Sequence, residues 1–378
     1  PTKTECKVRN AHPTNCSLLI VNCMKWWQNL KKNPLARFGA LLLLCFYLMA
    51  IAADFVAPYD PYASEEKGSL LPPSQIYWQT PQGEFIGPHV YPRTQGPVDL
   101  ETGKRDIVID KDKPAPVRLF VKGDRYKILG LIPWDRHLFG AIGEAKINIL
   151  GTDESSRDQF SRLVHGSRIS LFIGLVGIAI YFPLGMMVGG IAGYFGGWVD
   201  ATLMRVVEVL MTIPSIYLLV ALAAVLPVGL SSAQRFMLIV AITSFISWAG
   251  LARVIRGQVL SIKEQEFVQA ARAMGANSFY IIVRHVLPQT ATYVIVSATL
   301  AIPGFIVAES VLSLIGLGIQ QPDASWGNML SSATNATILT LHSWLVWPPA
   351  ALIILTVLAF NLLGDGLRDA LDPRSLRR

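Results

Sequence analysis

The chain has 378 residues, of which 52% are hydrophobic and only 16% are charged. Soluble proteins of this size carry about a quarter charged residues, and here the shortfall is concentrated in long runs almost free of charge, which is typical of a membrane protein. The net charge of +7 lies in short loops beside these runs, without a basic stripe interleaved with aromatic residues, so it argues for membrane topology and against nucleic-acid binding.

The N-terminal segment is polar and without pattern up to Met24, which opens a basic stretch that looks like a natural start. Residues 1–23 are therefore interpreted as an upstream extension. We expect residues 1–37 to form a cytoplasmic tail and residues 38–57 to form a retained first span, because this run is too long for a secretory signal. The four cysteines lie in these two segments without metal-binding spacing, so we expect neither a disulfide framework nor a metal site.

Six segments are long and apolar enough to cross a bilayer, for which roughly 20 residues are needed. They are residues 38–57, 169–192, 205–228, 235–254, 291–315 and 344–364. Basic residues gather before the first segment, between the fourth and the fifth, and after the sixth. With six crossings these groups fall on one side, and positive charge marks the cytoplasmic side, so both termini are predicted to be cytoplasmic. The predicted fold class is an all-α membrane protein with six transmembrane helices.

The polar segment 58–165, between the first two spans, is then predicted to be an extracytoplasmic insertion. It is rich in proline and glycine and contains two β-like pieces, RDIVID (105–110) and VRLFVKGDRYKILGLI (117–132). We predict a small, partly β domain. Its mixed charges form either a solvated surface or a docking surface for an external partner.

Residues 166–365 are expected to form a five-helix transmembrane core, followed by a cytoplasmic tail, residues 366–378. Four glycines recur every four residues and predict a groove that lets a neighbouring helix approach closely; they are Gly185, Gly189, Gly193 and Gly197. Three prolines are expected to kink their helices, since neighbours in a bundle can satisfy the freed carbonyls; they are Pro183, Pro214 and Pro303.

A cytoplasmic loop, residues 255–289, is too polar to enter lipid but has helical periodicity. Four of its small or apolar residues recur at helical spacing and predict one face of a short helix; they are Phe267, Ala270, Ala271 and Met274. Gly275 can adopt the left-handed conformation that ends a helix, and a second short helical pattern ends before Pro288. We predict a helical hairpin, although an amphipathic helix on the membrane surface would explain the periodicity equally well.

Charged groups at membrane depth are costly and often functional. Glu309, in the fifth span, either lines a translocation path or gate or makes a buried structural hydrogen bond. Arg205 and Glu208, three residues apart, are expected to pair on one helix face. Three charged residues before the second span either hold the insertion to the bundle or meet an external binding protein; they are Asp153, Arg157 and Asp158.

The sequence gives no sign of a catalytic centre. No phosphate-binding G-x-x-x-x-G-K-[ST] motif occurs, since the one Gly-Lys pair, Gly103-Lys104, lacks the upstream glycine. Neither paired carboxylates nor a Ser-His-Asp order falls in a plausible pocket. We therefore expect no catalytic residue, no metal site and no cofactor on this chain.

The loop resembles the "EAA" loop of membrane subunits of bacterial ATP-binding-cassette importers, which has Glu-Ala-Ala, three residues, a glycine and later Leu-Pro. Here the matching residues are Gln269-Ala270-Ala271, Gly275 and Leu287-Pro288. In that family the loop inserts a coupling helix into a cleft on the ATPase subunit. Gln269 stands at the acidic position, so a carboxylate that could pair with a base is replaced by an amide, and the resemblance implies a weaker or different contact there.

Other segments are similar to the dipeptide and oligopeptide permease branch of that family, in its second-permease type. They are GTDESSRDQFSRLVHGSRISL (151–171), GGWVDATLMRVVEVLMTIP (196–214), ESVLSLIGLGIQQPDASWGNML (309–330) and GDGLRDALDPR (364–374). Ser156 stands where the branch usually has glycine, and Glu208 where it has aspartate. The similarity covers roughly residues 34–57 and 150–374, whereas residues 60–148 carry little recognisable pattern.

The resemblance implies a type I importer permease in the bacterial inner membrane, a non-catalytic subunit that couples ATP hydrolysis by its partners to alternating access. Di- or oligopeptides are the expected cargo, with nickel or another small solute as the alternative. The implied partners are a second homologous permease, two ATPase subunits that carry ATP and Mg, and an extracytoplasmic substrate-binding protein. The residues implied to contact the ATPase are Phe267, Gln269, Ala270, Ala271, Met274, Gly275, Leu287 and Pro288.

Two other classes of protein remain as alternatives. A stand-alone secondary transporter would show inverted repeats and an ionisable site at the midplane, and we find no convincing repeat. A membrane-anchored receptor or scaffold would bind a ligand with its external domain without passage.

Overall fold

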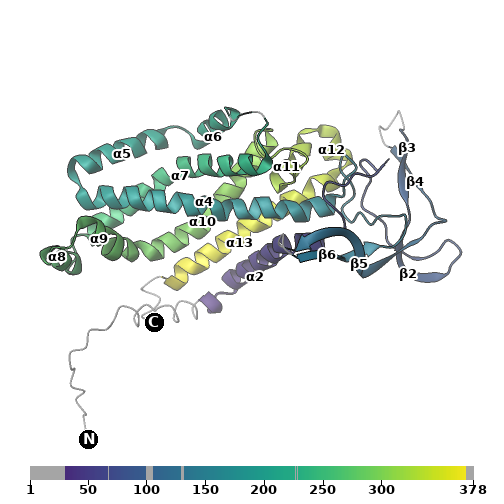
Figure 1. The fold of residues 1–378 in the computed structure, drawn as a ribbon, viewed down its shortest axis with the longest axis horizontal. Coiled ribbons are helices and arrows are strands. Elements are labelled where there is room, and N and C mark those ends of the chain that lie inside the picture. The colour runs from purple at the N-terminus through teal and green to yellow at the C-terminus, as the bar shows by residue number, and fades with distance from the viewer. Residues whose placement is uncertain are drawn as a thin grey trace, which may run out of the picture.

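A helical bundle and a β-rich segment at one of its ends make up the molecule (Figure 1). The computed structural model describes residues 30–66, 68–98, 105–128, 132–225, 227 and 229–371. The proposed upstream extension, the cysteines other than Cys45, the pair Gly103-Lys104 and the basic residues after Leu371 lie outside the described residues.

Five helices of the described chain are each long and apolar enough to cross a membrane. They are α2 (Pro34–Ile51), α4 (Gln159–Phe195), α7 (Ser232–Ile262), α10 (Ala291–Leu314) and α13 (Trp347–Leu371). A sixth crossing exists only if α5 (Gly197–Thr212) and α6 (Ser215–Ala224) count together, and these two helices meet at 84°. The predicted number of spans is therefore met only with a broken helix.

The third span, predicted over 205–228 with a kink at Pro214, is broken into two helices there. Its first helix begins already at Gly197 and ends at Thr212, after which Ile213 is extended, with φ −81° and ψ 124°. Pro214 causes the break, because it has no N–H to donate to the helix and it disfavours the helical conformation of the residue before it.

The other spans are displaced from their predicted limits by local capping. α2 begins at Pro34, four residues early, because the Asn33 side chain accepts hydrogen bonds from Leu35 N and Ala36 N at 3.1 and 3.2 Å. It ends at Ile51, and a short helix α3 (Ala53–Val56) follows. α7 runs on to Ile262, so residues 255–262 belong to this helix and not to the loop predicted over 255–289.

The glycine groove of α4 faces α7, as its spacing predicts. A Cβ on Gly185 would lie 2.7 Å from the Leu251 side chain, and one on Gly193 would lie 2.8 Å from Arg256 O. Gly189 is equally close to the backbone of α7. The fourth predicted member, Gly197, is not in the groove: it has φ +55°, starts α5 and has no atoms around its would-be Cβ.

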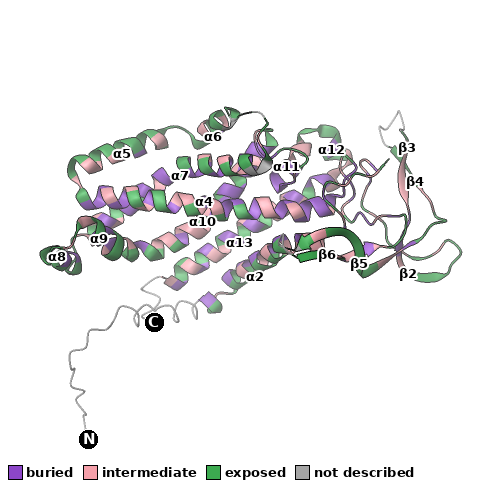
Figure 2. Ribbon diagram, in the orientation of Figure 1, coloured by how far each residue is buried: buried purple, intermediate pink, exposed green. Residues whose placement is uncertain are grey.

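The bundle core is an apolar cluster with buried members from α2, α4, α6, α7, α10 and α13. Ile239 and Val240 of α7, Ile306 of α10 and Ala359 of α13 have no exposed surface. Helix α5 is different, since Val207 is its one buried residue. Figure 2 shows α5 mostly exposed along the outside of the bundle.

The β-rich segment contains the predicted strands and several more. The strands are β1 (Tyr77–Gln79), β2 (Phe85–Val90), β3 (Arg93–Val98), β4 (Arg105–Ile109), β5 (Ala115–Ile128) and β6 (Ile132–Ala141). β1, β2, β5 and β6 form an antiparallel sheet in that order, and β3 pairs with β4. The sheet lies at one end of the bundle, opposite the end that carries α8 (Glu266–Ala273) and α9 (Ser278–Ile281) (Figure 1).

Short helical pieces complete the chain. Two irregular turns, η1 (Ile282–Val286) and η2 (Leu287–Thr290), join α9 to α10. At the strand end of the bundle lie α11 (Trp326–Leu330), η3 (Ser331–Thr334), α12 (Ala336–Leu341) and η4 (Ser343–Leu345).

Candidate functional site

The helical hairpin predicted between the fourth and fifth spans is present as α8 and α9, and we call residues 263–281 the knob. It projects at the end of the bundle where α2 begins and α13 ends (Figure 1). α8 ends at Ala273 with Met274 as its C-cap, and Gly275 follows with φ +80°, in the left-handed region that favours glycine. The Asn277 side chain then accepts from Phe279 N at 3.0 Å and starts α9.

The base of the knob is packed on the bundle. Val268 and Ala271 are buried in one apolar cluster with Val259 of α7 and Tyr194 of α4. Arg272 adds polar contacts to this packing. Its Nε donates to Tyr194 Oη at 3.1 Å, and its guanidinium lies 4.6 Å from the centre of the Tyr194 ring. The knob is therefore held against the ends of α4 and α7.

The outer face of the knob exposes several apolar side chains. Met274 is 81% exposed and Phe279 is 62% exposed, while Phe267 and Ala270 are also exposed. The prediction that Ala271 shares this face is wrong: it points into the bundle beside Val268, three positions earlier on the same helix. An exposed apolar face on a firmly held base is typical of a docking surface.

The amide at the usual acidic position has a local role. Gln269 Nε2 donates to Lys263 O at 3.2 Å, which ties α8 to the end of α7. A carboxylate cannot donate to a carbonyl oxygen. Gln269 therefore stabilises the knob's own backbone in a way that a glutamate at this position could not.

The second helical segment of the loop was predicted to end before Pro288, but it continues past this residue. Residues Ser278–Leu314 run as one long helical element. η1 is a turn of π-helix, and Pro288 lies at the start of the tight turn η2, where its missing N–H is not needed. Leu287 packs on α4, with its side chain 3.1 Å from where a Cβ on Gly190 would be, and Pro288 is exposed.

Glu309 is fully buried and hydrogen-bonded near the other end of α10. Ser313 Oγ and Ser325 Oγ each donate to its Oε1 at 2.7 Å. Ser325 is also the N-cap of α11, where its Oγ accepts from Asn328 N at 3.0 Å. Glu309 thus ties α10 to α11, and with no exposed surface in this conformation the structural alternative fits better than a path-lining one.

The charged residues before α4 form a network with the loop that follows α10. Arg157 Nη2 lies 2.7 Å from Asp153 Oδ2 and donates to Gln321 Oε1 at 2.6 Å. Arg162, which is buried, donates to the same Gln321 oxygen at 3.0 Å. Asp153 and Arg157 therefore fasten the start of α4 to the end of the fifth span.

Asp158 is part of the same turn but has a different role. It is buried and caps α4 by accepting from Ser161 N at 2.7 Å through Oδ2, while Oδ1 has no partner. Burial raises the pKa of Asp158 to about 7, although the hydrogen bonds from Ser161 act to lower it.

Comparison with known proteins assigns the chain to a family. Residues 185–377 match the family model of the binding-protein-dependent transport system inner membrane component. The chain belongs to this family. Residues 25–73 also match the model of the N-terminal TM domain of oligopeptide transport permease C.

Individual permeases of the family are similar over much of the chain. The dipeptide transport system permease protein DppC of Bacillus subtilis is 36% identical, covering 93% of this chain and 85% of that protein. The oligopeptide transport system permease protein OppC of Haemophilus influenzae is 42% identical, covering 60% of this chain and 70% of that protein. A solved structure of the MetNI methionine ABC transporter aligns at 19% identity and a TM-score of 0.37, over 56% of this chain and 96% of that one.

This permease is therefore a membrane-spanning translocation subunit of an ATP-driven, binding-protein-dependent importer. It is not the catalyst, because the ATPase of such systems is on separate subunits. Membership also implies, in general terms, a partner permease and a binding protein. Among the residues that the structure describes, no group of three or more His, Cys, Asp or Glu could hold a metal ion.

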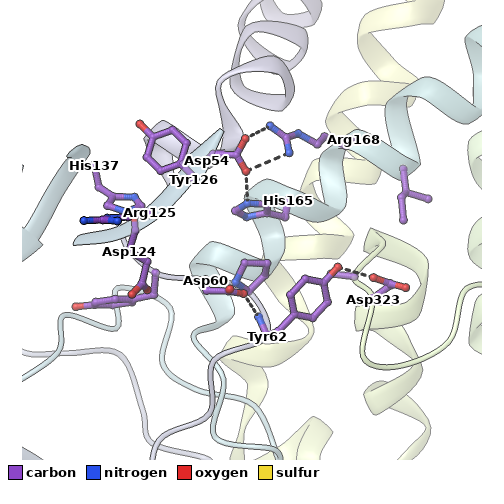
Figure 3. Close-up of a pocket in the computed structure, with 14 residues that line it drawn as sticks. Asp54, Asp60, Tyr62, Asp124, Arg125, Tyr126, His137, His165, Arg168 and Asp323 are labelled. Atoms are coloured by element: carbon purple, nitrogen blue, oxygen red, sulfur yellow. Dashed lines mark hydrogen bonds and ion pairs between the residues drawn. The ribbon is translucent and has the colours of Figure 1, made fainter. Parts of the chain in front are cut away.

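The sequence did not indicate a cavity whose lining includes several charged side chains. This cavity lies between the sheet and the bundle, has a volume of about 350 Å³ and is lined by Asp54, Tyr126, His165 and Arg168 among others (Figure 3). Arg168 Nη2 is 2.7 Å and His165 Nε2 is 3.1 Å from the Asp54 carboxylate. Burial acts to raise the pKa of Asp54, but the hydrogen bonds from His165 and Arg168 outweigh it and hold this pKa well below its usual range.

These missed residues carried only a weak signal. His165 and Arg168 stand within the segment 151–171 that resembles the permease branch, but their acidic partner, Asp54, is 111 residues away from His165. Tyr194, the partner of Arg272, is likewise 78 residues distant. The predicted short-range pair did form, since Arg205 Nη1 lies 3.3 Å from Glu208 Oε2 on exposed α5.

Proposed function

We propose that this permease imports di- or oligopeptides across the bacterial inner membrane. The named functions of its relatives support peptide cargo, since they include dipeptide and oligopeptide permeases. Nickel or another small solute is the alternative cargo. We further propose two homologous or identical permease chains, two ATPase subunits that bind ATP and Mg, and an extracytoplasmic binding protein that selects the solute.

We propose that the knob end of the bundle is cytoplasmic and the β-rich end extracytoplasmic. Basic residues support this orientation, because Lys32, Arg37, Arg256, Arg284 and Arg368 all lie near the knob end of their helices. Residues 1–37 and 366–378 are then cytoplasmic tails, 58–165 an extracytoplasmic insertion and 166–365 the transmembrane core. The fastening of Asp153 and Arg157 lies at the outer end, where a binding protein would dock.

The observation that carries the coupling role is the geometry of the knob. Its outer face offers Phe267, Ala270 and Met274 to a partner, while its base is held by Arg272 on Tyr194. When ATP closes the partner subunits, a docked knob would move with them and shift the bundle between outward-open and inward-open states. Leu287 and Pro288 continue this element into α10, which gives the motion a direct path to a span.

The Gly275→Val variant tests the coupling role. Valine at φ +80° costs roughly 1–2 kcal/mol of backbone strain, although no neighbouring atom would touch its Cβ. We expect the reconstituted importer with this variant to lose peptide uptake while ATP hydrolysis persists and the subunit remains inserted.

Two control variants separate strain from size. Gly275→Asn should retain uptake, because asparagine tolerates the left-handed region. Gly257→Val, in α7, also has open space around the added atoms but an ordinary φ, and it should retain uptake too. Normal uptake by Gly275→Val would remove the coupling role from the knob.

A further inference from the structure

The β5–β6 hairpin runs back from the sheet along α3, the short helix that follows α2. In the middle of the hairpin, the ring centres of Phe120 and Phe55 of α3 are 6.1 Å apart, and His137 Nδ1 is 2.5 Å from Ala57 O. Further along, Tyr126 lines the same cavity as Arg168, whose Nε donates to Ala50 O at 2.9 Å (Figure 3). By residue 126 the hairpin has therefore reached the cavity that lies beside the end of α2.

The hairpin continues beyond this point toward the membrane-spanning part of the bundle. Its outermost described pairs are Tyr126 with Trp134, Lys127 with Pro133, and Ile128 with Ile132. Two residues of strand add about 6–7 Å. The far end of the hairpin, which we call the hairpin tip (residues 126–128 and 132–134), is thus level with the end of the first span. Figure 1 shows β5 and β6 beside that end of α2.

The hairpin tip continues the exposed apolar face of α2, which is expected to contact lipid. α2 presents Leu44, Leu48 and Ile51 outward at helical spacing, each about half exposed, which is the face of a span that meets acyl chains. Ile132 is 59% exposed and Trp134 is 46% exposed, at the same end. Tryptophan and tyrosine are enriched where a membrane protein crosses the headgroup level.

The charge of the hairpin complements a phospholipid surface. β5 and β6 carry five basic and two acidic residues; they are Arg118, Lys122, Arg125, Lys127 and Arg136, and Asp124 and Asp135. Within the described part of the chain only Lys122 of these five has an acidic partner, Asp135 at 3.6 Å. Unpaired basic groups next to exposed aromatic and aliphatic side chains are the features that bind anionic headgroups.

We propose that the hairpin tip is a membrane-interface anchor that sits among the phospholipid headgroups beside α2. Ile132 and Trp134 lie at the boundary of the acyl chains, and Lys127 and Arg136 bind anionic phosphates. The anchor fixes the sheet relative to the bilayer and keeps the polar cavity next to it at the membrane surface. This inference requires only that the bundle spans a membrane, so it stands or fails independently of the coupling role of the knob.

A spin label tests where the hairpin tip lies. The full-length permease, with its four cysteines replaced by serine, would carry a nitroxide through Ile132→Cys in nanodiscs that contain phosphatidylglycerol and phosphatidylcholine. We expect the label to be relaxed by oxygen, which concentrates in lipid, more than by a water-soluble nickel chelate. The control is Phe85→Cys on β2, which is 67% exposed on the same sheet and should show the reverse.

A charge variant tests the headgroup contact. Lys127→Gln with Arg136→Gln should reduce the equilibrium ratio of membrane-seated to unseated hairpin tips by about fivefold for each lost charge in discs with phosphatidylglycerol. The accessibility of the label at residue 132 to oxygen and to the nickel chelate measures this ratio. In discs of phosphatidylcholine alone the same variant should change little. Lys111→Gln, which removes an exposed charge from a turn of the same insertion, is the control and should have no effect in either disc.

Three results would overturn the proposal. A label at residue 132 that the nickel chelate reaches as readily as the label at residue 85 places the hairpin tip in water. If the label at residue 132 is protected from the nickel chelate only after a binding protein is added, the hairpin tip is a protein-docking surface instead. Equal behaviour of the charge variant in both discs removes the anionic headgroup from the account.

Discussion

Ser156 shows how one backbone angle constrains the turn before α4. Its φ is +62°, in the region that favours glycine, and glycine is the residue expected at this position from the resemblance to the permease branch. The turn needs this angle, because Ser156 N donates to Asp153 O at 3.0 Å and its own carbonyl accepts from Glu65 N. The strain is tolerated because the surrounding bonds hold the turn.

Replacing this residue should release the strain. We expect Ser156→Gly to raise the free energy of unfolding by about 1 kcal/mol, since a serine at positive φ costs roughly 1–2 kcal/mol and glycine loses part of that gain through its freer unfolded chain. Thermal unfolding of the detergent-solubilised permease measures this. Ser155→Gly, at the neighbouring position with an ordinary φ, should be neutral or destabilising. Equal effects of the two variants would show that φ is not the cause.

Asp158 should make stability fall as pH rises. Burial raises its pKa to about 7 in the folded chain, against about 4 when unfolded, so the folded state holds the proton more tightly. Its contribution is fully present below about pH 4 and is lost as pH rises to about 7.

The comparison that isolates this group is Asp158→Asn, which keeps an oxygen for the cap on Ser161 N. The difference in melting temperature between the variant and the parent should grow in favour of the variant from pH 4 to pH 7. Comparing the two proteins removes the opposite contribution of His342, whose pKa is lowered by burial. A difference that does not vary with pH would mean that Asp158 is ionised throughout.

At the scale of elements, apolar length predicted which segments become spans but not where they bend or end. α10 (Ala291–Leu314) matched its predicted limits of 291–315 within one residue. The break at Pro214 was predicted only as a kink, since a proline's neighbours decide whether a helix continues past it. The inward direction of Ala271 depends on where the bundle lies, and helical periodicity alone does not include that information.

Close packing of α4 on α7 depends on the glycine groove. A Cβ on Gly189 would collide with Ala252 O, a backbone atom that cannot rotate away. We expect Gly189→Ala to destabilise the permease by roughly 1–3 kcal/mol, the usual cost of overpacking. Gly250→Ala, in α7 with open space at the added atom, should instead stabilise the permease by roughly 0.5–1 kcal/mol in the same unfolding assay, because alanine favours the helix over glycine. A neutral Gly189→Ala would contradict the observed helix contact.

At the scale of the whole molecule, the family and the knob could be predicted because their residues are contiguous. Gln269, Ala270 and Gly275 stand within one short segment, and the structure has the first two in α8 and the third in the turn that follows it. The cavity of Asp54 and Arg168 could not be predicted from the sequence, because its two sides come from segments about a hundred residues apart. The packing of the β5–β6 hairpin on α3 is a long-range contact of the same kind.

The proposed coupling mechanism requires the knob to be the part of this bundle that binds a separate ATPase subunit. A firm base and a free apolar face are what such a contact requires, and the described chain has both at the end opposite the sheet. Cross-linking in the assembled importer tests this most directly, with a photoreactive label on Met274→Cys and a control label on Phe85→Cys in β2. The account predicts that the label at residue 274 joins the permease to the ATPase subunit and the label at residue 85 does not. Labelling of lipid alone from residue 274 would contradict it.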